Sequence, residues 1–244
     1  MSLIQQISED IRFHEALKSC MNCGVCTAIC PAAEFHDYDP RVMITAVQSR
    51  NENQLEKLLS EDTIWLCGQC MSCKMRCPGG NFPGLMISVL RKYSQETGKF
   101  TQSRLGRQQY AIRKTIGENI LKLGYCVHPS AVLPELHPEQ GPVWDWIFKN
   151  PEIYDRFDAV IGQETTGTLR KIADKNLDEL KAIFDVTGGT EMFELIEKFS
   201  LEKMKELGFS DDQAGIDDYF QQIYSGNEKN VESGKHHVKK SNSN

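Results

Sequence analysis

The chain has 244 residues and a formal net charge of −6, and 40% of its residues are hydrophobic and 25% charged. This composition is typical of a water-soluble globular protein and excludes collagenous, fibrous and wholly disordered classes. The longest unbroken apolar run, residues 64–67, is far shorter than the roughly 20 residues of a membrane-spanning helix. No basic start precedes an apolar stretch, so the sequence predicts neither a membrane span nor a secretory signal.

The first part of the chain predicts short helices. Residues 1–19 indicate an opening helix with Ser8 as its N-cap, because two acidic residues follow Ser8 and would lie in the first turn. Asp39 is expected to cap a second helix that has Pro40 at its first position. A further short helix is expected over residues 54–59.

Residues 81–123 predict two amphipathic helices. The first is expected to end at Gly98, and its apolar face comprises Met86, Val89, Leu90 and Tyr93. The second is expected to begin after Ser103 and to end at Gly124. Its apolar face comprises Leu105, Ile112, Ile116, Ile120 and Leu123.

The composition of the remaining chain changes twice, from proline-rich to helical and then from helical to polar. Five prolines in residues 125–167 favour an irregular arm with one short helix around residues 144–148. Residues 168–224 return to helical periodicity, broken at Gly188-Gly189. The two apolar stripes are Leu169, Ile172, Ala173, Leu177, Leu180, Ile183 and Phe184, then Met192, Leu195, Ile196 and Phe199. The polar residues 225–244 are expected to be a disordered tail, and the whole pattern predicts an all-α protein.

Nine cysteines are the unusual feature of the composition. An odd number without an export signal disfavours a disulfide framework. In a reducing cytosol, clustered thiols are more often metal ligands than disulfides. The sequence therefore predicts a cytoplasmic metalloprotein.

Eight of the cysteines fall into two copies of one pattern, C-x2-C-x2-C-x3-C followed by proline. This pattern is typical of a pair of 4Fe-4S clusters, in which the fourth cysteine of each copy ligates the other cluster. The first cluster is therefore expected on Cys20, Cys23, Cys26 and Cys77. The second is expected on Cys67, Cys70, Cys73 and Cys30. The short spacing also lets backbone N–H groups of the intervening turns point at cluster sulfurs.

The alternative metal is zinc, in two four-cysteine sites that only brace the fold. Zinc ligands usually come as C-x2-C pairs that a longer loop separates. Four cysteines within eleven residues, ending in Cys-Pro, fit that arrangement less well. Iron–sulfur clusters are the favoured interpretation.

The segments CMNCGVCTAICP and IWLCGQCMSCKMRCP resemble the C subunit of heterodisulfide reductase. More broadly, they resemble the α-helical ferredoxin domain of succinate dehydrogenase iron–sulfur subunits. The resemblance covers roughly residues 8–125 and includes all eight ligands. It implies an α-helical ferredoxin domain over residues 1–124, followed by the arm (125–167), a C-terminal helical extension (168–224) and the tail (225–244).

The resemblance implies an electron-transfer subunit that does no bond chemistry itself. A B subunit would handle the disulfide or sulfane substrate, and a flavin-bearing A subunit would lie at the other end of a hetero-oligomeric complex. The C subunits of heterodisulfide reductases from methanogens tend to be shorter, so the long acidic extension favours the bacterial sulfur-oxidising type. No G-x-G-x-x-G, P-loop or cysteine–histidine arrangement indicates a catalytic site.

Local charge is more informative than the total. Residues 91–122 hold eight basic and two acidic residues, and residues 168–224 hold seven basic and thirteen acidic. The basic zone fits a solvated helical face, or a surface that docks a partner subunit or balances cluster charge. Nucleic acid is disfavoured, because the whole chain is acidic and has no recognised binding motif.

Three features stay open. Cys126 is expected to be an idle thiol, with a reactive thiol as the alternative. The aromatic arm around Trp144, Trp146 and Phe148 either folds over its own core or wraps a partner. The other functions to consider are an iron–sulfur subunit of another respiratory or redox complex, a redox-sensing cluster protein and a zinc-braced adaptor.

Overall fold

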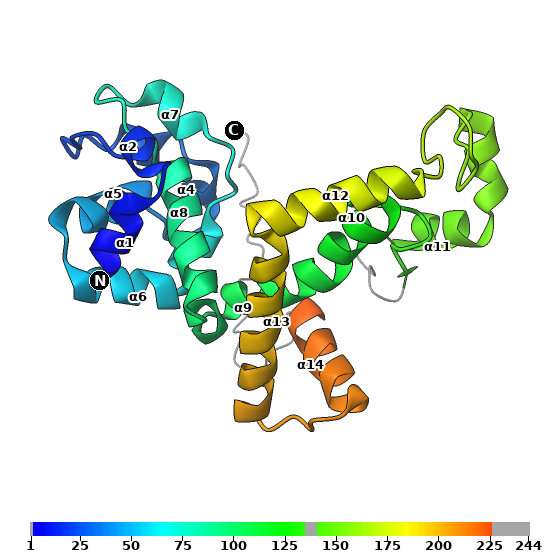
Figure 1. The fold of residues 1–244 in the computed structure, drawn as a ribbon. Coiled ribbons are helices and arrows are strands. Elements are labelled where there is room, and N and C mark those ends of the chain that lie inside the picture. Colours follow the sequence, from blue (N-terminus) through cyan, green and yellow to red (C-terminus); the bar gives the residue numbers. More distant parts are fainter. Residues whose placement is uncertain (1, 135–140, 226–244) are drawn as a thin grey trace, which may run out of the picture.

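The computed structural model describes residues 2–134 and 141–225. All regular elements in this part of the chain are helices (Figure 1). The one β-type pairing among the described residues is an isolated bridge between Ala159 and Thr168. The prediction of an all-α protein is confirmed.

The helices around the cysteine motifs are short. They are α1 (Leu3–Glu9), α2 (Phe13–Ala16), α3 (Val25–Ala28), α4 (Pro31–Phe35), α5 (Pro40–Ser49), α6 (Glu52–Ser60), the 3-10 helix η1 (Asp62–Leu66) and α7 (Ser72–Arg76). The longer helix α8 (Pro83–Glu96) contacts α1, α2, α5, α6 and α7. The buried side chains of this core include Ile7, Met43, Ile44, Leu55, Leu59, Ile64, Met86, Ile87 and Leu90.

The predicted caps are partly right. Asp39 accepts a hydrogen bond from the Arg41 N–H, with Pro40 at the first helical position, as expected. The N-cap of the first helix is Ser2, which forms a capping box with Gln5. The prediction of Ser8 was wrong: Ser8 lies inside α1, and its hydroxyl donates to the Gln5 carbonyl.

The next segment runs as a nearly continuous rod. It comprises the 3-10 helix η2 (Lys99–Gln102), α9 (Arg104–Ile112), the π-helical turn η3 (Arg113–Gly117) and α10 (Glu118–Leu123). Ser103 caps α9 and Gly124 ends α10 in the left-handed conformation, as predicted. Ile112 and Ile116 are 45% and 40% exposed, so the described residues cover the expected apolar face only in part.

The arm and extension contain α11 (Gly141–Lys149), the 3-10 helix η6 (Pro151–Phe157), α12 (Asp174–Thr187), α13 (Gly189–Glu206) and α14 (Gln213–Ser225). The break at Gly188-Gly189 is confirmed, because Gly188 ends α12 in the left-handed conformation. The first stripe was predicted to be helical from Leu169, but that residue has a φ of +63° and the helix begins at Asp174. The predicted tail lies outside the described residues, apart from Ser225.

The extension packs onto the rod at three glycines. A Cβ atom at Gly98, Gly117 or Gly124 would lie within 2.8 Å of an apolar side chain of the extension. The three side chains are Phe199, Phe193 and Ile172, respectively. The absence of a side chain at these glycines therefore leaves the space that the apolar side chains of the extension fill.

A second core lies between the rod and the last two helices. It comprises Tyr110, Ala111, Met204, Tyr219 and Ile223, and it crosses the predicted boundary at residue 124. Arg113 also pairs with Glu197 of the extension at 2.5 Å, and Lys114 with Glu197 at 3.5 Å. Part of the basic zone is therefore neutralised inside the chain.

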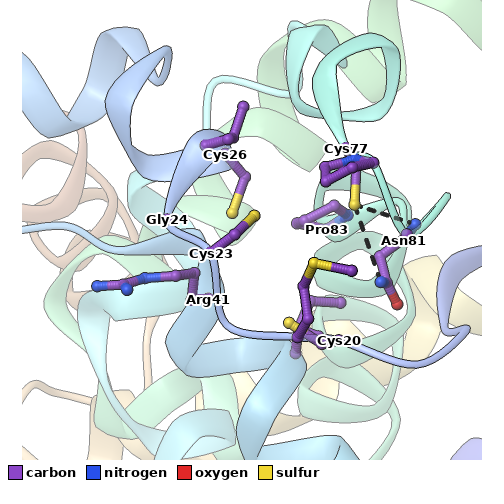
Figure 2. A pocket seen from close by; sticks show the side chains of 13 residues that line it. Cys20, Cys23, Gly24, Cys26, Arg41, Cys77, Asn81 and Pro83 are labelled. Carbon is purple, nitrogen blue, oxygen red and sulfur yellow. Dashed lines mark hydrogen bonds between the residues drawn. The ribbon is translucent and has the colours of Figure 1, made fainter.

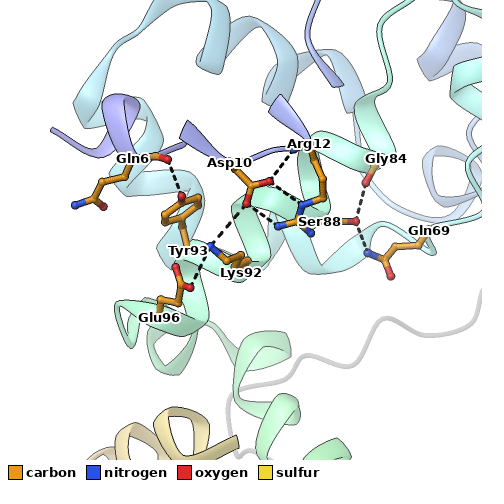
Figure 3. Close-up of polar contacts among 9 residues, drawn as sticks. All are labelled: Gln6, Asp10, Arg12, Gln69, Gly84, Ser88, Lys92, Tyr93 and Glu96. Carbon is orange, nitrogen blue, oxygen red and sulfur yellow. Dashed lines mark hydrogen bonds and ion pairs between the residues drawn. The ribbon is translucent and has the colours of Figure 1, made fainter. Parts of the chain in front are cut away.

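A polar network ties the N-terminal segment to α8 (Figure 3). The Asp10 carboxylate accepts two side-chain hydrogen bonds of 2.8 Å from Arg12 and lies 3.7 Å from the Lys92 amine. The Tyr93 hydroxyl donates to the Gln6 carbonyl at 2.6 Å. The hydrogen bonds from Arg12 outweigh burial and lower the pKa of Asp10 to about 2.

We expect Asp10→Asn to destabilise the fold by about 2 kcal/mol, because the carboxylate is held ionised below its ordinary pKa. A pKa lowered from 3.8 gives a contribution that is complete at neutral pH and lost as the pH falls toward 2. Thermal melts followed by circular dichroism under anaerobic conditions should show a Tm about 4–8 °C lower. The exposed Asp37→Asn is the matched control, and an equal effect of both changes would contradict the prediction.

Candidate metal centres

The cysteines of the two motifs surround two hollows. The first is here called site 1. Figure 2 shows the motif cysteines around it, together with Arg41 and Asn81. The thiols that line site 1 are those of Cys20, Cys23, Cys26 and Cys77. The fourth of these comes from the second motif.

The second hollow is here called site 2. Its thiols are those of Cys30, Cys67, Cys70 and Cys73, of which the first comes from the first motif. Helices α3 and α7, which carry Cys26 and Cys73, contact one another between the two motifs. The structure thus brings together the same two sets of four that the cysteine pattern assigns to separate clusters.

The two motifs follow the same backbone path. The residue before the second cysteine is left-handed in both copies, with φ of 60° at Asn22 and 50° at Gln69. The residue after the second cysteine is also left-handed in both, with φ of 80° at Gly24 and 62° at Met71. Non-glycine residues adopt this conformation at a cost. The strain is therefore part of how each loop turns its cysteines toward the hollow.

The fourth cysteine of each copy also has a matching geometry. Cys30 has φ −76° and ψ 118°, and Cys77 has φ −76° and ψ 114°. The proline that follows each one restricts its backbone to this extended region. The extended residue carries the chain out of its own loop, so its thiol lies at the hollow of the other motif.

Backbone N–H groups point at the cysteine sulfurs. The amides of Asn22 and Gln69 each lie 3.4 Å from the Sγ atom of the cysteine two residues earlier. Gly84 donates to Cys73 Sγ at 3.4 Å. Such donors favour the thiolate form that a metal needs. The expectation that the turns supply N–H groups to the sulfurs is met at the thiols themselves.

Asn81 joins the two motifs at site 1. Its backbone N–H lies 3.3 Å from Cys77 Sγ, and its side-chain oxygen accepts from the Lys18 N–H at 2.8 Å. Its side-chain nitrogen donates to the Ser19 carbonyl at 3.4 Å. The buried Asn81 therefore fixes the chain just before Cys20 against the cysteine that comes from the second motif.

A paired charge lies at site 1. Arg41 lines the hollow and forms an ion pair of 2.5 Å with Asp39. Burial acts to raise the pKa of Asp39, but hydrogen bonds from Arg41 and Thr27 together lower it. The carboxylate and the guanidinium are thus both charged, and their charges largely cancel.

At site 2, among the described residues, a tyrosine hydroxyl lacks a hydrogen-bond partner and an arginine guanidinium lacks a partner of opposite charge. The Tyr38 side chain lines the hollow, and its buried hydroxyl has no hydrogen-bond partner. Arg91 donates to the carbonyls of Ile64 and Cys67 at 2.8 and 2.7 Å, and no carboxylate of the described residues pairs with it. Unpaired buried donors and charges are costly. An anionic group in the hollow would satisfy both, so these residues fit an iron–sulfur cluster.

The thiols have different accessibilities. Cys23 and Cys70 are exposed, whereas the other six motif cysteines are partly covered. Burial raises the pKa of Cys26 and Cys73, and hydrogen bonds from Ser72 lower the pKa of Cys70. A bound metal offsets the cost of ionising the covered thiols.

The ninth cysteine lies apart from both sites. Cys126 is exposed and lines a separate groove with Ile112 and Ile116. Sequence reasoning overlooked Tyr38 and Asn81, and counted Arg91 only as one of several charges in the basic zone. No motif marks these residues, because their role comes from contacts between distant segments.

Comparison with known proteins identifies the chain. Residues 16–81 match the family described as a 4Fe-4S dicluster domain. The C subunit of the ferredoxin:CoB-CoM heterodisulfide reductase of Methanosarcina acetivorans is 30% identical over 209 residues, which are 85% of this chain and 76% of the relative. The chain belongs to the family of heterodisulfide reductase C subunits. It is an iron–sulfur electron-transfer subunit.

Two further relatives support this family assignment. The corresponding protein of Methanosarcina mazei is 26% identical over 145 residues, 59% of this chain and 82% of the relative. An iron-sulfur C subunit of the CoB–CoM heterodisulfide reductase of Methanocaldococcus jannaschii is 29% identical over 135 residues, 55% of this chain and 64% of the relative. All three are proteins of methanogens.

The similarity also bears on the extension. An aligned length of 209 residues exceeds the predicted ferredoxin domain, so it continues into the arm and the helical extension. A methanogen protein therefore shares residues beyond that domain. The length of this chain does not by itself indicate the bacterial sulfur-oxidising type, and that subtype stays a prediction. Within the described ranges, no helix combines the length and apolar character needed to cross a bilayer.

We expect Asn81→Ala to weaken site 1, because it leaves the partly buried Lys18 N–H without its acceptor. An unsatisfied buried donor costs about 1–3 kcal/mol. Release of iron to a chelator should then accelerate by about tenfold or more for half of the iron. The exposed Asn53→Ala is the control. Release at the wild-type rate from Asn81→Ala would show that Asn81 does not hold the site together.

Proposed function

We propose that this member of the heterodisulfide reductase family carries two 4Fe-4S clusters and relays electrons between a flavin-bearing A subunit and a B subunit that converts a disulfide or sulfane. The ligands at site 1 would be Cys20, Cys23, Cys26 and Cys77. Those at site 2 would be Cys67, Cys70, Cys73 and Cys30. When bound, such clusters supply one-electron transfer.

One observation carries the proposal: each hollow takes three thiols from one motif and the fourth from the other. Two separate zinc braces would not need this exchange. A zinc site also closes four thiolates on a single ion at about 2.3 Å. Four thiols supplied by two separate motifs around each hollow suit a multi-iron group that takes one ligand at each corner.

The chain's own residues would hold and insulate the clusters. Backbone N–H groups of the motif turns would stabilise the thiolates. Asn81 would keep the two motifs in register at site 1. The exposed Cys23 and Cys70 would mark the edge of each site nearest to solvent, where electron exchange with a partner is shortest.

The partners follow from membership of the family. Three relatives have names that place them in CoB-CoM heterodisulfide reductases, so a hetero-oligomer is the expected state. A bacterial sulfur-oxidising complex would use the same relay with a different substrate. We place the protein in the cytoplasm, where thiols stay reduced.

The exchange of ligands can be tested with single Cys→Ser variants of the full chain, purified without oxygen and studied by electron paramagnetic resonance after reduction. The wild type should contain about eight irons and show two interacting signals. Cys23→Ser and Cys77→Ser should perturb one signal, and Cys70→Ser and Cys30→Ser the other.

The pairing of the variants decides the outcome. If Cys77→Ser perturbs the same signal as Cys70→Ser, each motif closes on itself and the exchange is wrong. If the protein contains zinc or only four irons, the two-cluster proposal fails at the first step. Cys126→Ser, outside both sites, is the matched control and should leave both signals unchanged.

A further inference from the structure

The two sites have the same backbone but different charges around them. At site 1 the nearby cation, Arg41, is paired with Asp39 at 2.5 Å. This ion pair therefore adds little net charge at site 1.

Site 2 has an uncompensated cation. The partly buried guanidinium of Arg91 donates to the carbonyl of Cys67, a residue that lines the hollow, at 2.7 Å. It also lies over the Trp65 ring, 5.2 Å from the centroid. Its nearest ionisable neighbours are Cys67 and Tyr38, and no carboxylate of the described residues pairs with it. A guanidinium stays protonated under these conditions.

Site 2 also has a free donor. Tyr38 is 3% exposed, and its hydroxyl lacks a hydrogen-bond partner. The hydroxyl lies close to the Cys67 thiol, with which it interacts. It is thus available to donate to a thiolate or sulfide at site 2.

We infer that Arg91 and Tyr38 give site 2 a higher reduction potential than site 1. Reduction adds negative charge to a cluster, and a nearby cation or hydrogen-bond donor stabilises that charge. Site 1 has donors to its sulfurs as well, but its cation is neutralised. The inference rests on the proposed function, since it requires a cluster at each site.

The test is a redox titration of the full chain, followed by electron paramagnetic resonance. The wild type should give two midpoints, and the signal that Cys70→Ser perturbs should belong to the higher one. Arg91→Gln should lower that midpoint by about 59 mV or more, which is a tenfold change in the reduction equilibrium of a one-electron couple. The lower midpoint should stay in place.

Tyr38→Phe removes only the hydroxyl and keeps the ring, so it should fold even if Arg91→Gln does not. It should lower the same midpoint by a smaller amount. Asp39→Asn is the converse variant: it can still cap α5, but it frees the charge of Arg41, so the lower midpoint should rise.

The outcomes separate the two proposals. A protein with four irons, or with zinc, would overturn the proposed function. A protein with eight irons whose two midpoints coincide would overturn only the inference. The inference would also be overturned if the higher midpoint belonged to the signal that Cys23→Ser perturbs. It would be overturned as well if Tyr38→Phe left the higher midpoint unchanged.

Discussion

The exchange of the fourth cysteine between the two motifs is the constraint on which the other features depend. An extended residue followed by proline carries Cys30 and Cys77 out of their own loops and into the opposite hollow. Neither site is therefore complete without the other segment. Helices α5 and α6 lie between the motifs and form the core against α8, which holds both loops in place. Because metal binding is coupled to folding in such sites, loading one site should help to order the other.

The sequence was most informative where the determinants are local. Cysteine spacing, the caps at Asp39 and Ser103, and the break at Gly188 depend on a few adjacent residues, and the structure contains each as expected. Ser8 was predicted from the acidic residues that follow it, but the helix is capped by Ser2, whose signal is the glutamine three residues later. The roles of Tyr38, Asn81 and Arg91 were missed, since their contacts at the sites span segments far apart in the chain.

The basic zone shows why local charge alone was ambiguous. Several of its residues pair within the chain: Lys92 with Asp10 and Glu96, and Arg113 with Glu197. Arg91 instead lies next to a cysteine of site 2. The charged residues of this zone therefore have three different roles. Some stabilise the core, some bind the acidic extension, and Arg91 lies at one metal centre. A count of charges over a stretch of sequence gives their sum, but it does not show which charged side chain remains unpaired in the fold.

The two sites differ in what lies beside one position of the repeat. After the second cysteine, the first copy has Gly24 and the second has Met71, both left-handed. A Cβ atom at Gly24 would lie 3.5 Å from the Arg41 guanidinium, an ordinary contact distance, so this cation lies directly beside the first loop. In the second copy the Met71 side chain packs toward Gly84, and the cation reaches the loop through the Cys67 carbonyl instead. Two nearly identical loops thus have different electrostatic surroundings, and this difference is the basis of the order of potentials that we infer for the two sites.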